Sequence, residues 1–145
     1  MFTSSAFTDN GRLPQKYSCQ GDGISPPFTI SDIIPLTKSF ALTLDDPDAP
    51  NGTFHHWIVW NIDPTTKTID EDTLPNGAVM GANSAGQTGY VAPCPPAGTH
   101  RYIYTLYALD DTLNLDAGSQ RSEFDRAISG HVLSQTSLTG RYTKQ

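Results

Sequence analysis

Three short stretches of the chain combine chemically useful side chains with prolines that fix the shape of loops. They are residues 45–50 (DDPDAP), 55–61 (HHWIVWN) and 94–102 (CPPAGTHRY). Carboxylates accept hydrogen bonds, imidazoles both donate and accept them, and a phenol can do either. Binding residues concentrate in the loops at strand ends. We therefore expect these three stretches to close around one small pocket.

Apolar runs next to these stretches predict the strands that must position them. Residues 39–45 alternate between apolar and polar types, which is typical of a half-buried strand. Residues 56–62 are almost continuously apolar, which indicates a central strand covered on both faces. The full set of predicted strands is 2–7, 28–30, 39–45, 56–62, 101–109 and 132–142.

One helix is predicted, over residues 121–129. Phe124, Ala127 and Ile128 form an i, i+3, i+4 apolar stripe, and Gly130 suits the left-handed position after a helix. The 12 glycines and 11 prolines otherwise separate short apolar runs throughout the chain. This pattern indicates an all-β sandwich or barrel.

Length and charge restrict the class of protein further. The 145 residues predict a single domain spanning 1–145 with a hydrophobic core. A net charge of -6 argues against nucleic-acid binding, because an acidic surface repels a phosphate backbone. The first residues do not have the pattern of a signal peptide, and no apolar run approaches the ~20 residues of a transmembrane helix. We expect a soluble, cytoplasmic protein.

The two cysteines, Cys19 and Cys94, are expected to be reduced thiols, since no export signal is visible. A disulfide stays open as an alternative, because the sequence does not give the distance between them. No Cys-x-x-Cys or Cys/His zinc pattern occurs, so no metal and no cofactor is expected.

The two longest motifs resemble those of the phosphatidylethanolamine-binding protein family, also called the Raf kinase inhibitor protein family. One motif is Asp46-Pro47-Asp48-Ala49-Pro50 followed by His56-Trp57, and the other runs from Pro95 to Tyr102. Residues 19–27 and 130–142 are similar to the two ends of the short bacterial and archaeal members. The resemblance covers almost the whole chain.

This resemblance implies a β-sandwich with Greek-key connections, one short C-terminal helix and few other helical turns. It also implies a pocket for a small anion such as phosphate, acetate or a phospholipid head group. Carried over position by position, the ligand-binding residues would be Asp46, Asp48, His56, Pro96, His100 and Tyr102. Some short relatives form dimers, so a homodimer is an open alternative.

Simple stereochemistry adds expectations for individual residues. Strand alternation should turn His56 into the pocket and His55 away from it. An aspartate can orient a histidine through its second nitrogen, as carboxylates do around metal sites. A histidine near a carboxylate should also have a raised pKa. Arg101 is expected in a structural ion pair, whereas Arg121 is expected to be an ordinary surface charge.

Three classes of function fit these residues. The leading hypothesis is a non-catalytic protein that binds small anions or phospholipid head groups, because no activated nucleophile is recognisable. The second is an inhibitor of a protein partner, either a kinase or a serine protease. The third is a hydrolase, using either Cys94 with His100 or a metal held by Asp46, His56 and His100.

Overall fold

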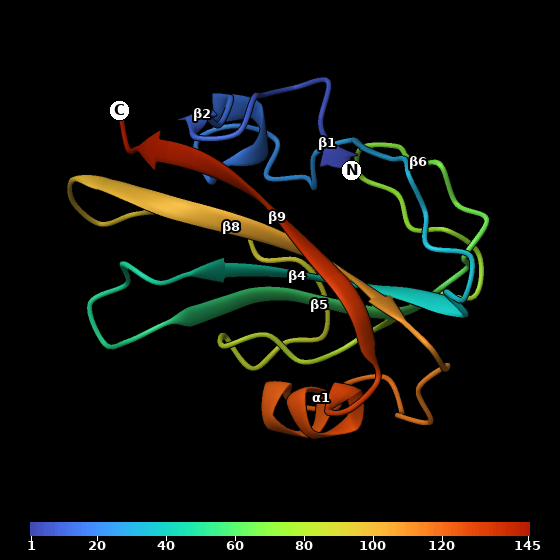
Figure 1. Cartoon of the computed structure of the whole chain (residues 1–145). Coiled ribbons are helices and arrows are strands. Elements are labelled where there is room, and N and C mark those ends of the chain that lie inside the picture. Colours follow the sequence, from blue (N-terminus) through green and yellow to red (C-terminus); the bar gives the residue numbers. More distant parts are fainter.

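Two β-sheets and one α-helix make up the computed structural model, which describes residues 1–145 (Figure 1). The elements in chain order are β1 (Phe2–Thr3), β2 (Gly11–Arg12), the 3-10 turn η1 (Gln15–Tyr17), β3 (Phe28–Ile30), β4 (Ser39–Asp46), β5 (Phe54–Ile62), β6 (Thr68–Ile69), β7 (Val79–Met80), β8 (Thr99–Leu109), α1 (Arg121–Ile128) and β9 (Val132–Thr143).

The larger sheet has six strands in the order β2-β9-β8-β4-β5-β7, and the smaller one has three in the order β1-β3-β6. Strand β4 pairs antiparallel with β5 on one side and β8 on the other. The chain therefore passes from β5 across β4 before it forms β8, which is a Greek-key type of connection. The all-β sandwich expected from the sequence is confirmed.

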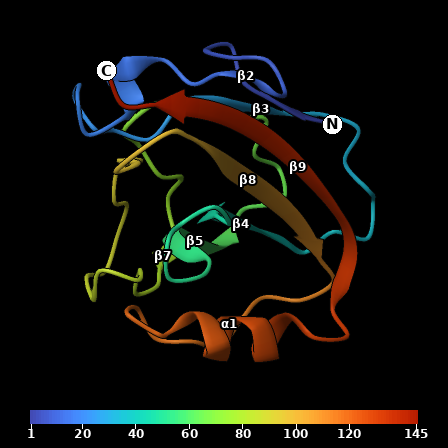
Figure 2. The same cartoon turned by 90° about the vertical axis from the view of Figure 1, so that its left-hand side faces the viewer.

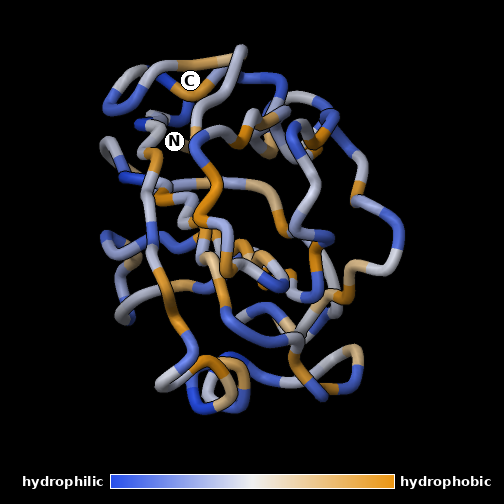
Figure 3. The backbone as a smooth tube through the Cα atoms, turned by 45° about the vertical axis from the view of Figure 1, so that its right-hand side comes forward, coloured by the Kyte–Doolittle hydropathy of each residue, from blue (hydrophilic) through white to orange (hydrophobic).

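Buried apolar side chains lie on both faces of the six-stranded sheet. Figure 3 shows where the hydrophobic stretches fall along the backbone. On one face, Phe40, Leu42 and Leu44 belong to a large core shared with the small sheet. On the other face, Ala41 belongs to a smaller core with Phe124 of α1. Figure 2 shows α1 beneath the sheet and the N-terminal segments above it. The half-buried strand expected at residues 39–45 is therefore wrong: α1 covers its second face.

Helix α1 has the predicted apolar stripe, with Phe124 and Ile128 buried against the sheet. Its first turn is closed by a reciprocal capping box, in which Gln120 and Glu123 each satisfy the other's main-chain N–H. Gly130 has φ +81°, a conformation that disfavours side chains with a Cβ atom. The first predicted strand is shorter than expected, because only Phe2 and Thr3 pair with β3.

A disulfide joins Cys19 and Cys94, whose Cα atoms are 5.3 Å apart. The expectation of two reduced thiols is therefore wrong. The two residues lie 75 positions apart in sequence, and only the fold brings the N-terminal segment next to the loop before β8. No helix in the structure is long and apolar enough to cross a membrane.

Candidate functional site

A pocket of about 200 Å³ lies at the end of the large sheet where β4 stops and where β5 and β8 start. Its lining consists of Asp46, Ala49, Pro50, Phe54, His56, Val91, Ala92, Cys94, Pro96, His100 and Tyr102. Five of the six residues expected from the sequence therefore line one pocket. Antiparallel pairing explains this, because it brings the C-terminal end of β4 beside the N-terminal ends of both neighbours.

His56 reaches the pocket because of a β-bulge. Leu44 pairs with Trp57 and Asp45 pairs with His55, so His56 is the extra residue on β5. Trp57 already faces the large core, and strict alternation would send His56 to the helix side. The bulge keeps both side chains on the same face. His56 thus points into the pocket and His55 points to the helix side, as expected.

The buried pair of Asp46 and His100 forms the polar floor of the pocket. The Nδ1 atom of His100 lies 2.6 Å from Oδ2 of Asp46, and both side chains are less than a tenth exposed. Because a carboxylate accepts, Nδ1 carries the proton and donates it. The Nε2 atom of His100 has no partner in the protein, so it is available to a ligand.

His56 is held by a main-chain carbonyl instead of a carboxylate. Its Nδ1 donates to the carbonyl oxygen of Val91 at 2.8 Å, which leaves its Nε2 without a protein partner. Burial lowers the pKa of His56 below its ordinary value of 6.5. The raised pKa expected for a histidine near carboxylates is therefore wrong for His56, since desolvation outweighs the attraction of Asp46.

Tyr102 supplies a third polar atom to the pocket. Its ring lies nearly perpendicular to that of His56, with ring centroids 5.5 Å apart, and its hydroxyl is buried without a hydrogen-bond partner of normal geometry. Burial, reinforced by the negative charge of Asp46, raises the pKa of Tyr102 well above its usual range. The phenol therefore keeps its proton. Its hydroxyl makes no hydrogen bond of normal geometry, although it lies close enough to Asp46 for that carboxylate to raise its pKa.

Asp48 is the one expected pocket residue that does not line the pocket. Its carboxylate accepts three hydrogen bonds from Arg101, of which the two from the guanidinium measure 3.0 and 2.8 Å. These bonds lower the pKa of Asp48 to about 2. Its main-chain N–H meanwhile donates to Oδ1 of Asp46 at 2.8 Å. Asp48 therefore braces the loop, and the ion pair expected for Arg101 is confirmed.

The walls of the pocket are mainly apolar and come from two loops, of which only the one that contains Ala49 and Pro50 overlaps a motif noted in the sequence. Ala49, Pro50 and Phe54 form one wall, and Val91 and Ala92 form the opposite one. A binding role leaves no signal in such small apolar residues. No group of three or more His, Cys, Asp or Glu side chains is arranged to hold a metal ion.

A larger cavity of about 570 Å³ lies on the helix side of the same sheet and includes His55 and Arg121. Arg121 donates to both oxygens of Asp45, at 2.7 and 3.0 Å, and to Asp125 at 2.9 Å. The expectation of an ordinary surface charge is therefore wrong, since its side chain is only 14% exposed. With its one arginine neutralised by two carboxylates, this cavity offers little to an anion. The smaller pocket is the better candidate.

Comparisons with known proteins identify relatives along nearly the whole chain. Residues 3–143 match the family model for phosphatidylethanolamine-binding protein. A UPF0098 protein of Methanothermobacter thermautotrophicus is 43% identical over 144 residues, covering 96% of this chain and 95% of the relative. A UPF0098 protein of Chlamydia muridarum is also 43% identical, covering 97% and 96%.

Two solved structures have a closely similar fold. The putative phosphatidylethanolamine-binding protein homologue CT736 from Chlamydia trachomatis superposes with a TM-score of 0.95 at 41% identity, covering 99% of this chain and 97% of that one. YbcL of Escherichia coli, described as a new member of the mammalian PEBP family, gives a TM-score of 0.93 at 30% identity, covering 100% and 98%.

Proposed function

The chain belongs to the phosphatidylethanolamine-binding protein family, and from this premise we propose that its pocket binds a small anionic group without catalysing its conversion. The ligand class is a phosphate or a carboxylate, either free or as part of a phospholipid head group. One observation supports the proposal most strongly. Three polar groups without protein partners, Nε2 of His56, Nε2 of His100 and the hydroxyl of Tyr102, belong to residues that line one small pocket.

These groups suit an anion whose binding is accompanied by the uptake of a proton by the site. Nδ1 of each histidine is already committed as a donor, so Nε2 can donate to a ligand oxygen only when the ring is protonated. Asp46 accepts the hydrogen bond from Nδ1 of His100 and so fixes the orientation of that ring. Apolar walls exclude water and strengthen the hydrogen bonds made inside the pocket.

The non-catalytic part of the proposal rests on the absence of an activated nucleophile. Cys94 was the candidate for a Cys-His hydrolase, and its sulfur is committed to the bond with Cys19. A thiolate, not a disulfide sulfur, is the nucleophile in such enzymes. A pocket can bind an anion and still lack anything that favours a transition state.

A cytoplasmic location also remains a proposal. The disulfide is evidence against it, because cytosolic thiol systems keep most such bonds reduced. Fractionation of the native host, with the redox state of Cys19 and Cys94 trapped by alkylation, would settle both points together.

Calorimetric titration with phosphate and with acetate tests the binding proposal. Wild-type protein should bind both anions saturably at one site. His100→Ala should abolish binding, whereas His131→Ala is a matched control, because His131 is on the surface at the far end of β8 and pairs with Asp110. Equal affinity in His100→Ala and wild type would refute the site.

A further inference from the structure

The disulfide joins two residues that are exposed at the surface beside the pocket. Cys19 and Cys94 are both exposed, whereas Ser18, Pro93 and Pro95 next to them are buried. Exchange requires a thiolate to approach one sulfur, so it depends on access. Structural disulfides that resist reduction are shielded, and exposed ones belong to the labile class.

Few hydrogen bonds attach the pocket-side loop, residues 92–98, to the protein, although its Pro93 and Pro95 are buried. Three of its seven residues are prolines, which have no main-chain N–H to donate. Only one main-chain hydrogen bond involves this loop, and it runs from the N–H of Cys19 to the carbonyl oxygen of Pro93 at 2.9 Å. The disulfide and the one main-chain hydrogen bond of this loop therefore both connect it to Cys19.

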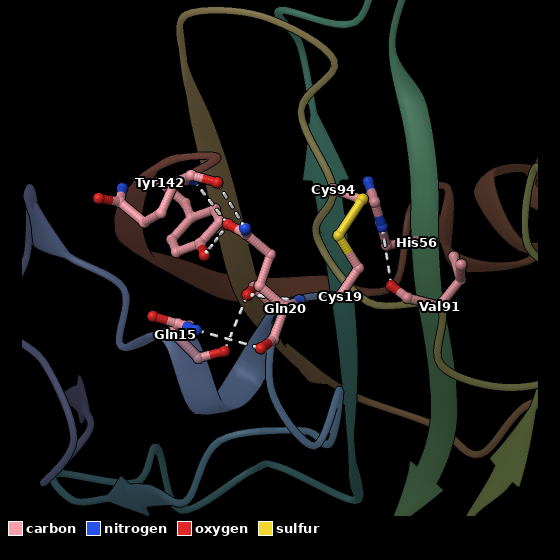
Figure 4. The surroundings of a disulfide bond; sticks show 9 residues. Gln15, Cys19, Gln20, His56, Val91, Cys94 and Tyr142 are labelled. Carbon is pink, nitrogen blue, oxygen red and sulfur yellow. Dashed lines mark hydrogen bonds between the residues drawn. A yellow bond between two sulfur atoms is a disulfide. The ribbon is translucent and has the colours of Figure 1, made fainter.

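The segment on the other side of the bond is firmly held (Figure 4). The side chain of Gln20 accepts from the hydroxyl of Tyr142 at 2.6 Å and from the main-chain N–H of Gln145 at 2.7 Å. The hydroxyl of Ser18 donates to the carbonyl oxygen of Gln15 at 2.8 Å. The disulfide thus ties a weakly attached loop to a fixed one.

That weakly attached loop is one wall of the pocket. Ala92, Cys94 and Pro96 all line it, and Val91 just before them orients His56 through its carbonyl oxygen. His56 and Cys94 line the same pocket. Any loosening of residues 92–98 therefore reaches the pocket wall directly.

We propose that the Cys19–Cys94 bond is a thiol–disulfide exchange site for a dithiol reductant, and that its reduction weakens anion binding in the adjacent pocket. A thiolate of the reductant attacks one sulfur and forms a mixed disulfide, while the other cysteine leaves as a thiolate and takes up a proton. The second thiol of the reductant then closes its own disulfide and releases the first cysteine. Two electrons pass from the dithiol to the protein.

The effect on binding follows from preorganisation. In the oxidised protein the wall is held in place before the ligand arrives. In the reduced protein the ligand must order residues 92–98, which lowers the net affinity. We expect at least about a fivefold loss, the lower end of usual coupling between sites. This part rests on the proposed anion binding.

The experiment treats native protein with dithiothreitol without denaturant, counts free thiols, and measures hydrogen exchange and acetate affinity in both redox states. We expect two thiols to appear, exchange to rise at the main-chain N–H groups of Cys19 and Val91, which hold this loop, but not in β4, and affinity to fall. Cys19→Ser breaks the bond without altering a residue that lines the pocket, so it should match the reduced protein and show no further response to dithiothreitol.

Two results would overturn the inference. In the first, the thiols appear only after denaturation. In the second, they appear in the native state while exchange and affinity stay unchanged, which would make the bond a structural cross-link alone. Absence of acetate binding in the oxidised protein would instead refute the proposed function, and hydrogen exchange would still decide whether reduction frees the loop.

Discussion

At the scale of single residues, removal of the Tyr102 hydroxyl should have opposite effects on stability and on anion binding. A buried donor without a partner costs about 1–3 kcal/mol, and Tyr102 has no partner in the protein. Tyr102→Phe should therefore raise the free energy of unfolding by about 1 kcal/mol while weakening anion binding several-fold.

Tyr142→Phe is the matched control for that substitution. Its hydroxyl donates to Oε1 of Gln20 at 2.6 Å, so its removal should lower the free energy of unfolding instead. Denaturant unfolding and calorimetry on both variants measure the two quantities. A destabilised Tyr102→Phe with unaltered affinity would mean that the phenol serves packing and not binding.

The low pKa of His56 predicts how affinity depends on pH. Above that pKa the ring is neutral, with its one proton on Nδ1, so binding through Nε2 requires the uptake of a proton. Acetate affinity should consequently fall as pH rises from about 5 to 8, approaching tenfold per pH unit for one proton taken up.

His56→Gln isolates this contribution from that of His100. The variant should bind acetate more weakly at pH 5 and show a shallower pH profile, once the ionisation of acetate itself is included. Wild-type affinity that does not change with pH would contradict binding through a protonated His56.

At the scale of elements, the ion pair between α1 and β4 fixes the helix to the sheet. Arg121→Met leaves the largely buried Asp45 without its main partner and should lower the free energy of unfolding by about 2 kcal/mol, allowing for partial exposure. Arg126→Ala, on the exposed face of α1, should stay within about 0.5 kcal/mol of wild type.

Against the opposing effect of burial, hydrogen bonds from His55 and from Arg121 hold the pKa of Asp45 below its ordinary value of 3.8. A carboxylate with a depressed pKa stabilises the fold above its unfolded pKa, and this contribution is lost as pH falls through the lower, folded pKa. The difference between Arg121→Met and wild type should therefore persist at neutral pH and shrink below about pH 4. Denaturant unfolding at pH 7 and pH 3 checks this, and a difference that grows in acid would contradict it.

At this scale the strands could be predicted from local patterns of apolar residues, but the packing between elements could not. The runs that became β4, β5 and β8 were predicted correctly because each carries a long apolar pattern, and β9 was also predicted although most of its residues are polar. The bulge that turns His56 into the pocket could not be predicted from the sequence, because it depends on how β5 pairs with β4. The burial of both faces of β4 depends on where α1 docks, which is equally non-local.

The residues of the pocket were likewise predictable only where the sequence carries a motif. The family motifs placed Asp46, His56, Pro96, His100 and Tyr102 together at one pocket, because the motifs encode strand ends that antiparallel pairing unites. Asp48 is adjacent in sequence to the pocket but is drawn to Arg101, a partner 53 residues away. Val91 and Ala92 have apolar side chains and lie outside the motifs, so their place in the pocket wall could not be predicted.

At the scale of the whole molecule, the disulfide closes a long loop of the chain. Cross-linking residues 75 apart restricts the unfolded state and is worth about 4 kcal/mol in the chain-entropy model. Cys19→Ser should therefore lower the free energy of unfolding by roughly that amount. Denaturant unfolding under non-reducing conditions measures it, and a loss below about 1 kcal/mol would show that the unfolded chain is not restrained by the bond.

The most direct test of anion binding in this pocket uses the four histidines as internal probes. Nitrogen-15 NMR of the imidazole rings, recorded during an acetate titration, reports each Nε2 separately. We predict that His56 and His100 shift together and saturate with one dissociation constant, while His55 on the helix side and His131 on the surface remain unchanged. Unchanged His56 and His100 signals, or equal shifts in all four rings, would contradict an anion site in this pocket.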